Sequence, residues 1–501
     1  MLFNSYQFML FFPVVLSVYF VLPKRIRLYW LLVASYYFYM SWNAKYALLL
    51  LFSTSVTYLC GLLLGHWEKQ KDRIALSKLT RLKKLSVGIS VFMNLSILVF
   101  FKYFDFMFRS INAISVKVFH TSLNNPAFDI VLPVGISFYI FQALGYTIDV
   151  YRGTIAPEKN FFKYALFVSF FPQLVAGPIE RSKNLLKQLE KPASFSFEAF
   201  RNGIFLMIWG FFLKIVVADR AAVIVNQIYN NYQQYPGGYL VVATVIFAFQ
   251  IYCDFAGYSA IAIGTAETLG VKLMENFNAP YLAMSCGEFW RRWHISLSTW
   301  FRDYVYIPLG GNRKGKVRKH INILIVFALS GLWHGASWSF AFWGFLNGAY
   351  QVIGDLLDKP RKKIVSIFHL DVESVAHRLF RILTTFILID FSWIFFRAQG
   401  IKASIQIIKS IFRYYNPWVL FDGSMFNCGL DQKELRVLVI GIVLLLVVDF
   451  FKYKGVSIRE VILRQDAWFR WLVFSVSIVF ILVFGMWGTG YEGEAFIYFQ
   501  F

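Results

Sequence analysis

The chain is dominated by apolar stretches that each approach the length needed to cross a bilayer. A membrane-spanning helix needs about 20 apolar residues. Stretches near that length cover residues 8–22, 28–42, 46–65, 85–104, 130–148, 161–177, 204–218, 240–264, 321–339, 340–357, 379–396, 435–451 and 468–487. We therefore predict an all-α polytopic membrane protein with roughly eleven to thirteen membrane helices, some of them re-entrant.

Composition supports this class. Of the 501 residues, 58% are hydrophobic, 20% are aromatic and only 16% are charged, far from the balance of a soluble globular chain. The sequence has no clear internal repeat and no Pro/Ser/Gly linker long enough to separate soluble domains. We predict one membrane domain over residues 1–501, with its functional core at about 130–350. The first stretch lacks preceding basic residues and a cleavage pattern, which predicts a retained helix.

The basic residues gather at the ends of the apolar stretches. The net charge is +22, and its main groups lie at 24–27, 69–84, 313–319, 359–363 and 452–470. Such groups mark cytoplasmic loops, so we expect the N-terminus outside and His334 roughly 20 Å along its helix from the cytoplasmic end. Because this topology accounts for the charge, we expect anionic lipid headgroups as counterions and no nucleic-acid partner.

Neither cysteines nor histidines are spaced as metal ligands. Cys60, Cys253, Cys286 and Cys428 are scattered, and the seven histidines contain no HExxH arrangement. We predict no disulfide framework, no metal site and no tightly bound cofactor.

An ionisable imidazole lies inside one of the apolar stretches. His334 is the histidine of SGLWHGASW at 330–338, and intramembrane histidines are costly enough to suggest a functional role. The alternative is a packing residue, with Gly331 and Gly335 forming a face for close helix contact. Both interpretations stay open on spacing alone.

A second histidine lies in an aromatic and basic segment. His294 belongs to EFWRRWHISLSTWFRD at 288–303. A helical projection places the aromatic residues of 289–301 on one arc, with His294 at its edge. This pattern predicts an interfacial or re-entrant amphipathic helix. The helix should end downstream, at Pro308 and the glycine pair 310–311. The alternative for His294 is an interfacial residue beside an aromatic belt.

Other ionisable residues also fall in apolar surroundings, and we interpret them as polar pairs within or between helices. They are Asp254, Glu267, Lys214, Asp390 and Asp449. Of these, Asp254 is the best candidate for orienting a partner.

Several longer motifs together carry a family resemblance. They are LPVGISFY at 132–139, DVYRG at 149–153, FPQLVAGPI at 171–179, DFAGY at 254–258, ENFNAPY at 275–281, residues 289–311, LWHG at 332–335 and FIYFQF at 496–501. With these motifs the chain resembles the membrane-bound O-acyltransferase (MBOAT) family, in its bacterial alginate O-acetylation (AlgI-like) branch. The resemblance covers most of the chain.

The resemblance implies a fold and an activity. The implied fold is a ring of helices around a thin centre, with funnels from each face meeting near the catalytic histidine. It implies that His334 is catalytic and that His294 is the second active-site residue. Candidate substrate-binding residues are Trp333, Trp290, Ser298, Arg302, Asp303 and Asp254.

The implied substrates are a thioester donor and an exported polysaccharide. The donor is acetyl-CoA or an acyl carrier protein thioester, and the acceptor is reached directly or through an SGNH-hydrolase-like extracytoplasmic acyltransferase partner. A related branch performs D-alanyl transfer from a carrier protein, but the length and C-terminal sequence favour the alginate-like branch. The implied location is a bacterial cell membrane, either the inner membrane of a Gram-negative cell or the plasma membrane of a Gram-positive one.

Acyl transfer fits the chemistry of the two histidines. Transfer to a hydroxyl needs a base for its proton, and imidazole is suited to this near neutral pH. As a hypothesis, His334 activates the acceptor, while His294 orients the donor or supplies a proton or hydrogen bond near the developing oxyanion. The remaining alternatives are a polysaccharide transporter and a non-catalytic scaffold of an export complex.

Overall fold

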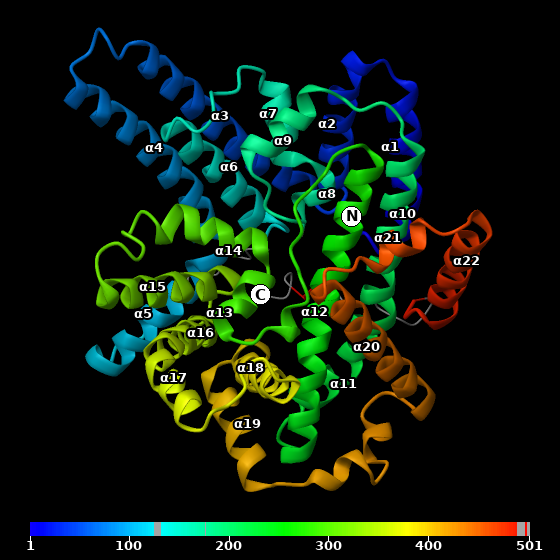
Figure 1. The fold of residues 1–501 in the computed structure, drawn as a ribbon. Coiled ribbons are helices and arrows are strands. Elements are labelled where there is room, and N and C mark those ends of the chain that lie inside the picture. Colours follow the sequence, from blue (N-terminus) through cyan, green and yellow to red (C-terminus); the bar gives the residue numbers. More distant parts are fainter. Residues whose placement is uncertain (125–131, 176, 488–495, 498–501) are drawn as a thin grey trace. The chain divides into compact units, whose positions relative to one another are not determined.

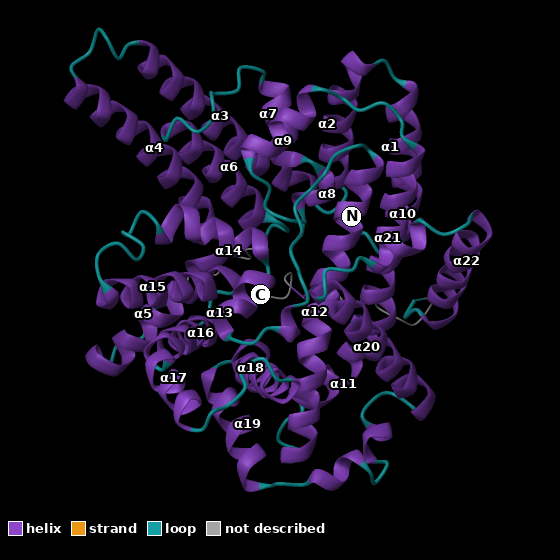
Figure 2. Cartoon of the chain, in the orientation of Figure 1, coloured by secondary structure: helices purple, strands orange, loops and turns teal. Residues whose placement is uncertain are grey.

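Helices account for all the regular structure that the described residues form. The computed structural model describes residues 1–124, 132–175, 177–487 and 496–497. Within these ranges no strand occurs, as Figure 2 shows. The all-α prediction is confirmed. Four expected segments fall partly outside the described residues. They are the start of the 130–148 stretch, position 176 of both the 161–177 stretch and FPQLVAGPI, and the last four residues of FIYFQF.

The chain divides into two compact units by its internal contacts. Unit 1 comprises Met1–Ile204 and Ala262–Met274, and unit 2 comprises Phe205–Ile261 and Glu275–Phe501. Helices α10 (Phe197–Phe211) and α12 (Gly237–Thr268) contribute residues to both. The single membrane domain stays a prediction.

Unit 1 consists mainly of the helices labelled α1 to α9 in Figure 1. Its helices are α1 (Tyr6–Val21), α2 (Lys24–Met40), α3 (Ala47–Lys69), α4 (Leu76–Leu98), α5 (Phe104–Phe119), α6 (Ile136–Tyr151), α7 (Phe161–Ser169), α8 (Phe171–Leu174) and α9 (Ser182–Glu190). Helix α3 packs against α4, α6 and α7. Between α3 and α4 the Ser53 hydroxyl donates to Asn94 at 2.5 Å, so these buried polar groups satisfy each other.

Unit 2 holds the segments that carry both histidines. Its remaining helices are α11 (Asp219–Asn230), α13 (Cys286–Arg292), α14 (Ile295–Phe301), α15 (Lys316–His334), α16 (Trp338–Leu356), α17 (Asp358–Ile367), α18 (Val375–Arg397), α19 (Ile401–Arg413), α20 (Gln432–Tyr453), α21 (Ile458–Leu463) and α22 (Ala467–Phe484). Helices α15 and α16 form its most extensively packed pair. At their contact a Cβ on Gly344 would lie only 3.0 Å from the Gly331 Cα, which requires glycine at both positions.

Several helices are long and apolar enough to cross a bilayer, so the protein is a multi-pass membrane protein. Among the described residues, five helical segments meet this criterion: Ala44–Lys69, Leu76–Phe119, Gly237–Thr268, Val375–Arg397 and Ala467–Phe484. The range of eleven to thirteen crossings stays a prediction. The expected stretch 340–357 corresponds to α16, whereas the expected stretch 321–339 is interrupted where α15 ends at His334.

Candidate active site

His334 is the last residue of α15. The next residue, Gly335, has an extended backbone, and the Ser337 side chain accepts from the Phe340 N–H to cap α16. The chain therefore reverses directly after the imidazole. The His334 ring lies 5.2 Å from the Trp343 ring and 5.6 Å from the Phe396 ring, centroid to centroid, within an aromatic wall built from α16 and α18.

His294 lies at a break between two helices, so the prediction of one continuous amphipathic helix over 289–301 is wrong. Helix α13 ends at Arg292 and α14 begins at Ile295, while His294 adopts φ 43° and ψ 54°. This left-handed conformation is uncommon for a residue other than glycine. Such backbone strain is found more often at functional sites than elsewhere.

The break has a physical cause in the ENFNAPY segment. The Asn276 carbonyl accepts from the Ile295 N–H at 3.0 Å, and the Asn278 N–H donates to the Arg292 carbonyl at 3.0 Å. The Asn276 side-chain oxygen also accepts from the Ser296 N–H at 3.3 Å. These bonds occupy backbone groups on both sides of His294 that a continuous helix would use internally. The chain is thereby held open at the histidine.

The structure brings the two imidazoles together. Their ring centroids are 6.3 Å apart and tilted by 58°, and the residues are 1% (His294) and 3% (His334) exposed. The Trp333 ring lies 5.9 Å from His294 and 5.0 Å from His334. Phe255 of α12 also contacts His294 and packs perpendicular to the imidazole, at 4.6 Å between ring centroids.

Burial lowers the pKa of the His294 imidazole to about 3, because its aromatic surroundings disfavour the imidazolium. His294 is therefore neutral at physiological pH, and it can donate or accept a hydrogen bond without carrying charge.

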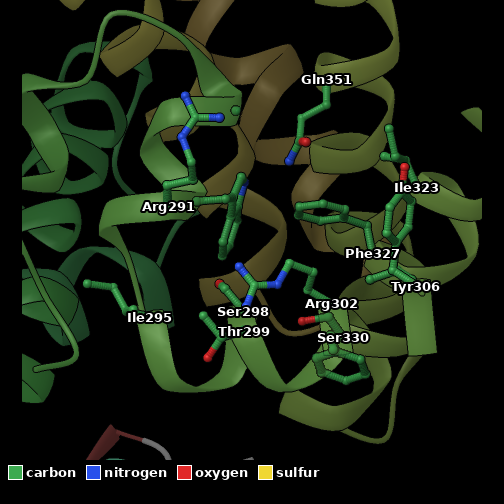
Figure 3. Close-up of a pocket in the computed structure, with 14 residues that line it drawn as sticks. Arg291, Ile295, Ser298, Thr299, Arg302, Tyr306, Ile323, Phe327, Ser330 and Gln351 are labelled. Atoms are coloured by element: carbon green, nitrogen blue, oxygen red, sulfur yellow. The ribbon is translucent and has the colours of Figure 1, made fainter. Parts of the chain in front are cut away.

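A cavity of about 550 Å³ adjoins the histidine-bearing segments (Figure 3). Its lining residues are Gly287, Trp290, Arg291, Ile295, Ser298, Thr299, Phe301, Arg302, Tyr306, Ile323, Val326, Phe327, Ser330 and Gln351. Ile295 directly follows His294, and Ser330 lies one helical turn before His334. In Figure 3, Ser298 and Thr299 lie to the left of Phe327 and Ile323, and the Arg302 side chain lies between them, beside Ser330. The cavity is mainly apolar but contains two arginines.

The family model for the membrane-bound O-acyltransferases matches residues 155–387, a range that includes both histidines and the whole cavity lining. The probable alginate O-acetylase AlgI of Pseudomonas putida is 32% identical to this chain over 100% of both. The chain belongs to the MBOAT family. It is a membrane-embedded O-acyltransferase.

Other MBOAT relatives differ in the acceptor that their names give. The peptidoglycan O-acetyltransferase of Helicobacter pylori is 32% identical over 82% of this chain and 80% of its own length. The teichoic acid D-alanyltransferase of Bacillus subtilis is 26% identical over 49% of this chain and 64% of its own length. The similarity of this MBOAT protein to the acetylating relatives thus extends over more of the chain.

The candidate substrate-binding residues fall into four groups in the MBOAT structure. Trp290, Ser298 and Arg302 line the cavity. Asp303 accepts from the neighbouring Arg302 at 2.8 Å and so holds one of the two cavity arginines. Trp333 contacts both imidazoles rather than the cavity. The roles of all these residues in binding stay predictions.

Asp254 has a different position. Its carboxylate accepts from Lys214 at 2.7 Å and from the Ile497 backbone N–H at 2.8 Å. Its neighbour Phe255 contacts His294, so Asp254 is joined to that imidazole through packing. The interpretation of Lys214 and Asp254 as members of an interhelix polar pair is confirmed. The same is true of Asp449, whose carboxylate accepts from the Tyr252 hydroxyl of α12.

Sequence reasoning missed several residues of the site. Asn276, which holds the break at His294, lies in a motif that was noticed only for its resemblance. Arg291 and Thr299 lie in the segment that was singled out, on sides that the helical projection did not select. Gln351 carries no local signal, because the α15–α16 hairpin brings it to the cavity. Tyr306 lies in the short π-helix Arg302–Tyr306 that directly follows α14.

Proposed function

We propose that this acyltransferase moves an acetyl group from a cytoplasmic thioester across the membrane to a hydroxyl of an exported cell-surface polysaccharide. The pair of buried imidazoles at two facing chain interruptions is the observation that carries the proposal. The relatives that cover most of the chain are named for acetylation, which favours acetyl over D-alanyl as the transferred group.

The proposed chemical step uses His334 as the base. Its neutral imidazole takes the acceptor hydroxyl proton as that oxygen bonds to the thioester carbonyl carbon. The carbon–sulfur bond then breaks, and the proton passes from the imidazolium to the departing thiolate. Neutral His294 supports this step by a hydrogen bond near the carbonyl oxygen, where negative charge develops. The products are an ester and a free thiol.

The proposed donor is acetyl-CoA. Arg291 and Arg302 line the cavity beside the histidine-bearing segments, and arginine pairs favourably with phosphate. The basic group at 313–319 supplies further positive charge at the end that we predict to be cytoplasmic. An acyl carrier protein thioester is the alternative donor, and it would use the same positive charge.

The proposed acceptor route ends outside the cytoplasm. Acetyl passes either directly to the polysaccharide or first to an SGNH-hydrolase-like extracytoplasmic acyltransferase. The relatives' names give alginate, peptidoglycan and teichoic acid, which supports a polymeric cell-surface acceptor without selecting one.

The test is transfer of labelled acetyl from acetyl-CoA by membranes that also contain the native partner and polysaccharide. We compare the wild type with His334→Ala, His294→Ala and His66→Ala at matched folded abundance. His66 is the control because it lies at the end of α3 and hydrogen-bonds Gln70. We expect label on glycan or partner with the wild type and His66→Ala, and loss of transfer in the other two variants. Wild-type transfer by folded His334→Ala would overturn the catalytic assignment.

Two controls address the alternative functions and donors. Movement of intact glycan without acyl transfer would support a transporter, and tolerance of both histidine substitutions in cells would support a scaffold. Transfer from an acetylated carrier protein but not from acetyl-CoA would replace the proposed donor while keeping the reaction.

A further inference from the structure

Three ionisable side chains form a buried cluster in unit 2. The Lys214 ammonium lies 2.8 Å from an Asp219 oxygen and 2.7 Å from an Asp254 oxygen, and the three side chains are 1%, 2% and 4% exposed. Taking charges out of water is costly unless they are paired. Lys214 lies in a seven-residue π-helix, Phe212–Ala218, and π-helical segments are frequent at functional sites.

The cluster is joined to the candidate active site through one turn of α12. Asp254 lies in the cluster, and the next residue, Phe255, packs perpendicular to the His294 ring. The second Asp254 oxygen accepts from the Ile497 N–H. The adjacent Phe496 ring contacts Phe255 at 5.7 Å. Two consecutive residues of α12 therefore contact different groups: Asp254 belongs to the ion cluster, and Phe255 contacts the His294 imidazole.

Close backbone packing limits the freedom of that turn. A Cβ on Gly257 would lie 2.7 Å from the Gly210 carbonyl oxygen and 3.0 Å from the Lys214 backbone nitrogen. Such short distances mean that α12 and the segment carrying Lys214 touch backbone to backbone. A change in the ion cluster is therefore transmitted to the α12 turn rather than absorbed by flexible side chains.

We propose that Lys214, Asp219 and Asp254 are positioning residues for His294. By fixing the α12 turn, they keep Phe255 against the imidazole and hold His294 at its distance from His334. This inference rests on the proposed function for its kinetic consequence. Its structural consequence, the restraint of the His294 ring, can be measured without any acyl transfer.

The kinetic test compares Lys214→Met and Asp254→Asn with the wild type as purified folded protein. Lys214→Met removes the cation, and Asp254→Asn keeps a hydrogen-bond acceptor while removing one charge. We expect kcat for acetyl transfer to fall about 10- to 100-fold, because small displacements of reacting groups have effects of that size, while KM for the donor changes less than about two-fold. A purely structural role would lower the yield of folded protein and leave kcat per folded molecule unchanged, which would overturn the proposal.

Asn94→Leu is the matched control, because Asn94 is an equally buried polar residue that pairs with Ser53 in unit 1. We expect this variant to lose stability while retaining the wild-type kcat. A fall in kcat equal to that of Asp254→Asn would show that any loss of a buried polar contact has the same effect, and would contradict a specific positioning role.

A second measurement uses the rate at which diethyl pyrocarbonate modifies His294, followed by mass spectrometry. We expect slow modification in the wild type and Asn94→Leu, and at least ten-fold faster modification in Lys214→Met and Asp254→Asn. Unchanged rates would overturn the positioning role, whatever acyl group the enzyme transfers. If the wild type transfers no acetyl but the two variants are still modified faster at His294, the proposed function is contradicted and the positioning role is supported.

Discussion

A methyl group on Gly331 should displace His334, the proposed base, without touching it. In Gly331→Ala the new Cβ would lie 2.2 Å from the Phe340 carbonyl oxygen and 3.1 Å from the Gly344 Cα. Non-bonded carbon atoms normally lie ~3.5–4.0 Å apart. Both contacts are with the backbone, so no side-chain rotation relieves them. The α15–α16 hairpin must open by roughly 1 Å at this point.

That opening should affect both stability and activity. Overpacking of this kind costs about 1–3 kcal/mol. His334 lies one turn beyond Gly331 on α15, and its neighbour Trp343 precedes Gly344 on α16. A displacement of roughly 1 Å at a reacting group can cost up to about 100-fold in rate. We therefore expect Gly331→Ala to lower kcat for acyl transfer by about 10- to 100-fold.

The assay measures labelled acyl transfer per folded molecule, with thermal unfolding measured in the same detergent. Gly354→Ala is the control, because this glycine lies on α16, in the same hairpin, but a Cβ there would meet nothing within 4 Å. The control should keep wild-type kcat and gain about 0.5–1 kcal/mol of stability, as alanine replaces glycine within a helix. Wild-type activity and stability in Gly331→Ala would refute the reasoning.

Three further substitutions test other parts of the site. Asn276→Leu should destabilise the protein by about 1–3 kcal/mol and lower kcat, because it leaves buried hydrogen-bonding groups unsatisfied. An unchanged unfolding temperature would contradict a role of the Asn276 side chain in holding the helix break at His294. Arg302→Gln should raise the donor KM with little change in kcat, and steady-state kinetics with an unaltered KM would remove the arginine from donor binding. The hydrogen bonds from His320 and Lys319 lower the pKa of Asp355 from 3.8 to about 2, so this carboxylate stabilises the α15–α16 pair above pH 4 and loses that effect as pH falls towards 2. Asp355→Asn should therefore flatten the pH dependence of thermal unfolding between pH 4 and pH 2. The effect should be small, because the side chain is 39% exposed. A profile identical to that of the wild type would contradict the pairing.

Local sequence patterns predicted several residues of the candidate site, but they did not predict the backbone geometry of those residues. His294 and His334 were detected because imidazoles among aromatic and apolar residues are costly unless they have a function. The helix break at His294 was missed because it depends on hydrogen bonds from Asn276, eighteen positions earlier, and a helical projection includes only neighbours on one helix. The close helix contact expected at Gly331 is present, against Gly344. Gly335, the second residue of the expected face, lies beyond the end of α15 and faces the Phe340 ring instead. Packing and function were treated as alternatives for the segment around His334. In the structure both occur, because α15 packs against α16 at Gly331 and its last residue, His334, lies at the candidate site.

The position of each imidazole at a chain interruption also explains why both must be enclosed by protein. Where a helix stops, backbone N–H and C=O groups lose their internal partners, and hydrocarbon offers none. The interruption before α14 is closed by Asn276, and the one after α15 by the reversal into α16. An aromatic side chain of α18 joins the two segments: the Trp393 ring lies 5.3 Å from Trp293 and 5.5 Å from Trp343. Since Trp293 precedes His294 and Trp343 contacts His334, this tryptophan spans both arms of the site. The aromatic residues therefore enclose the interrupted backbone at both imidazoles and link the two segments that carry them.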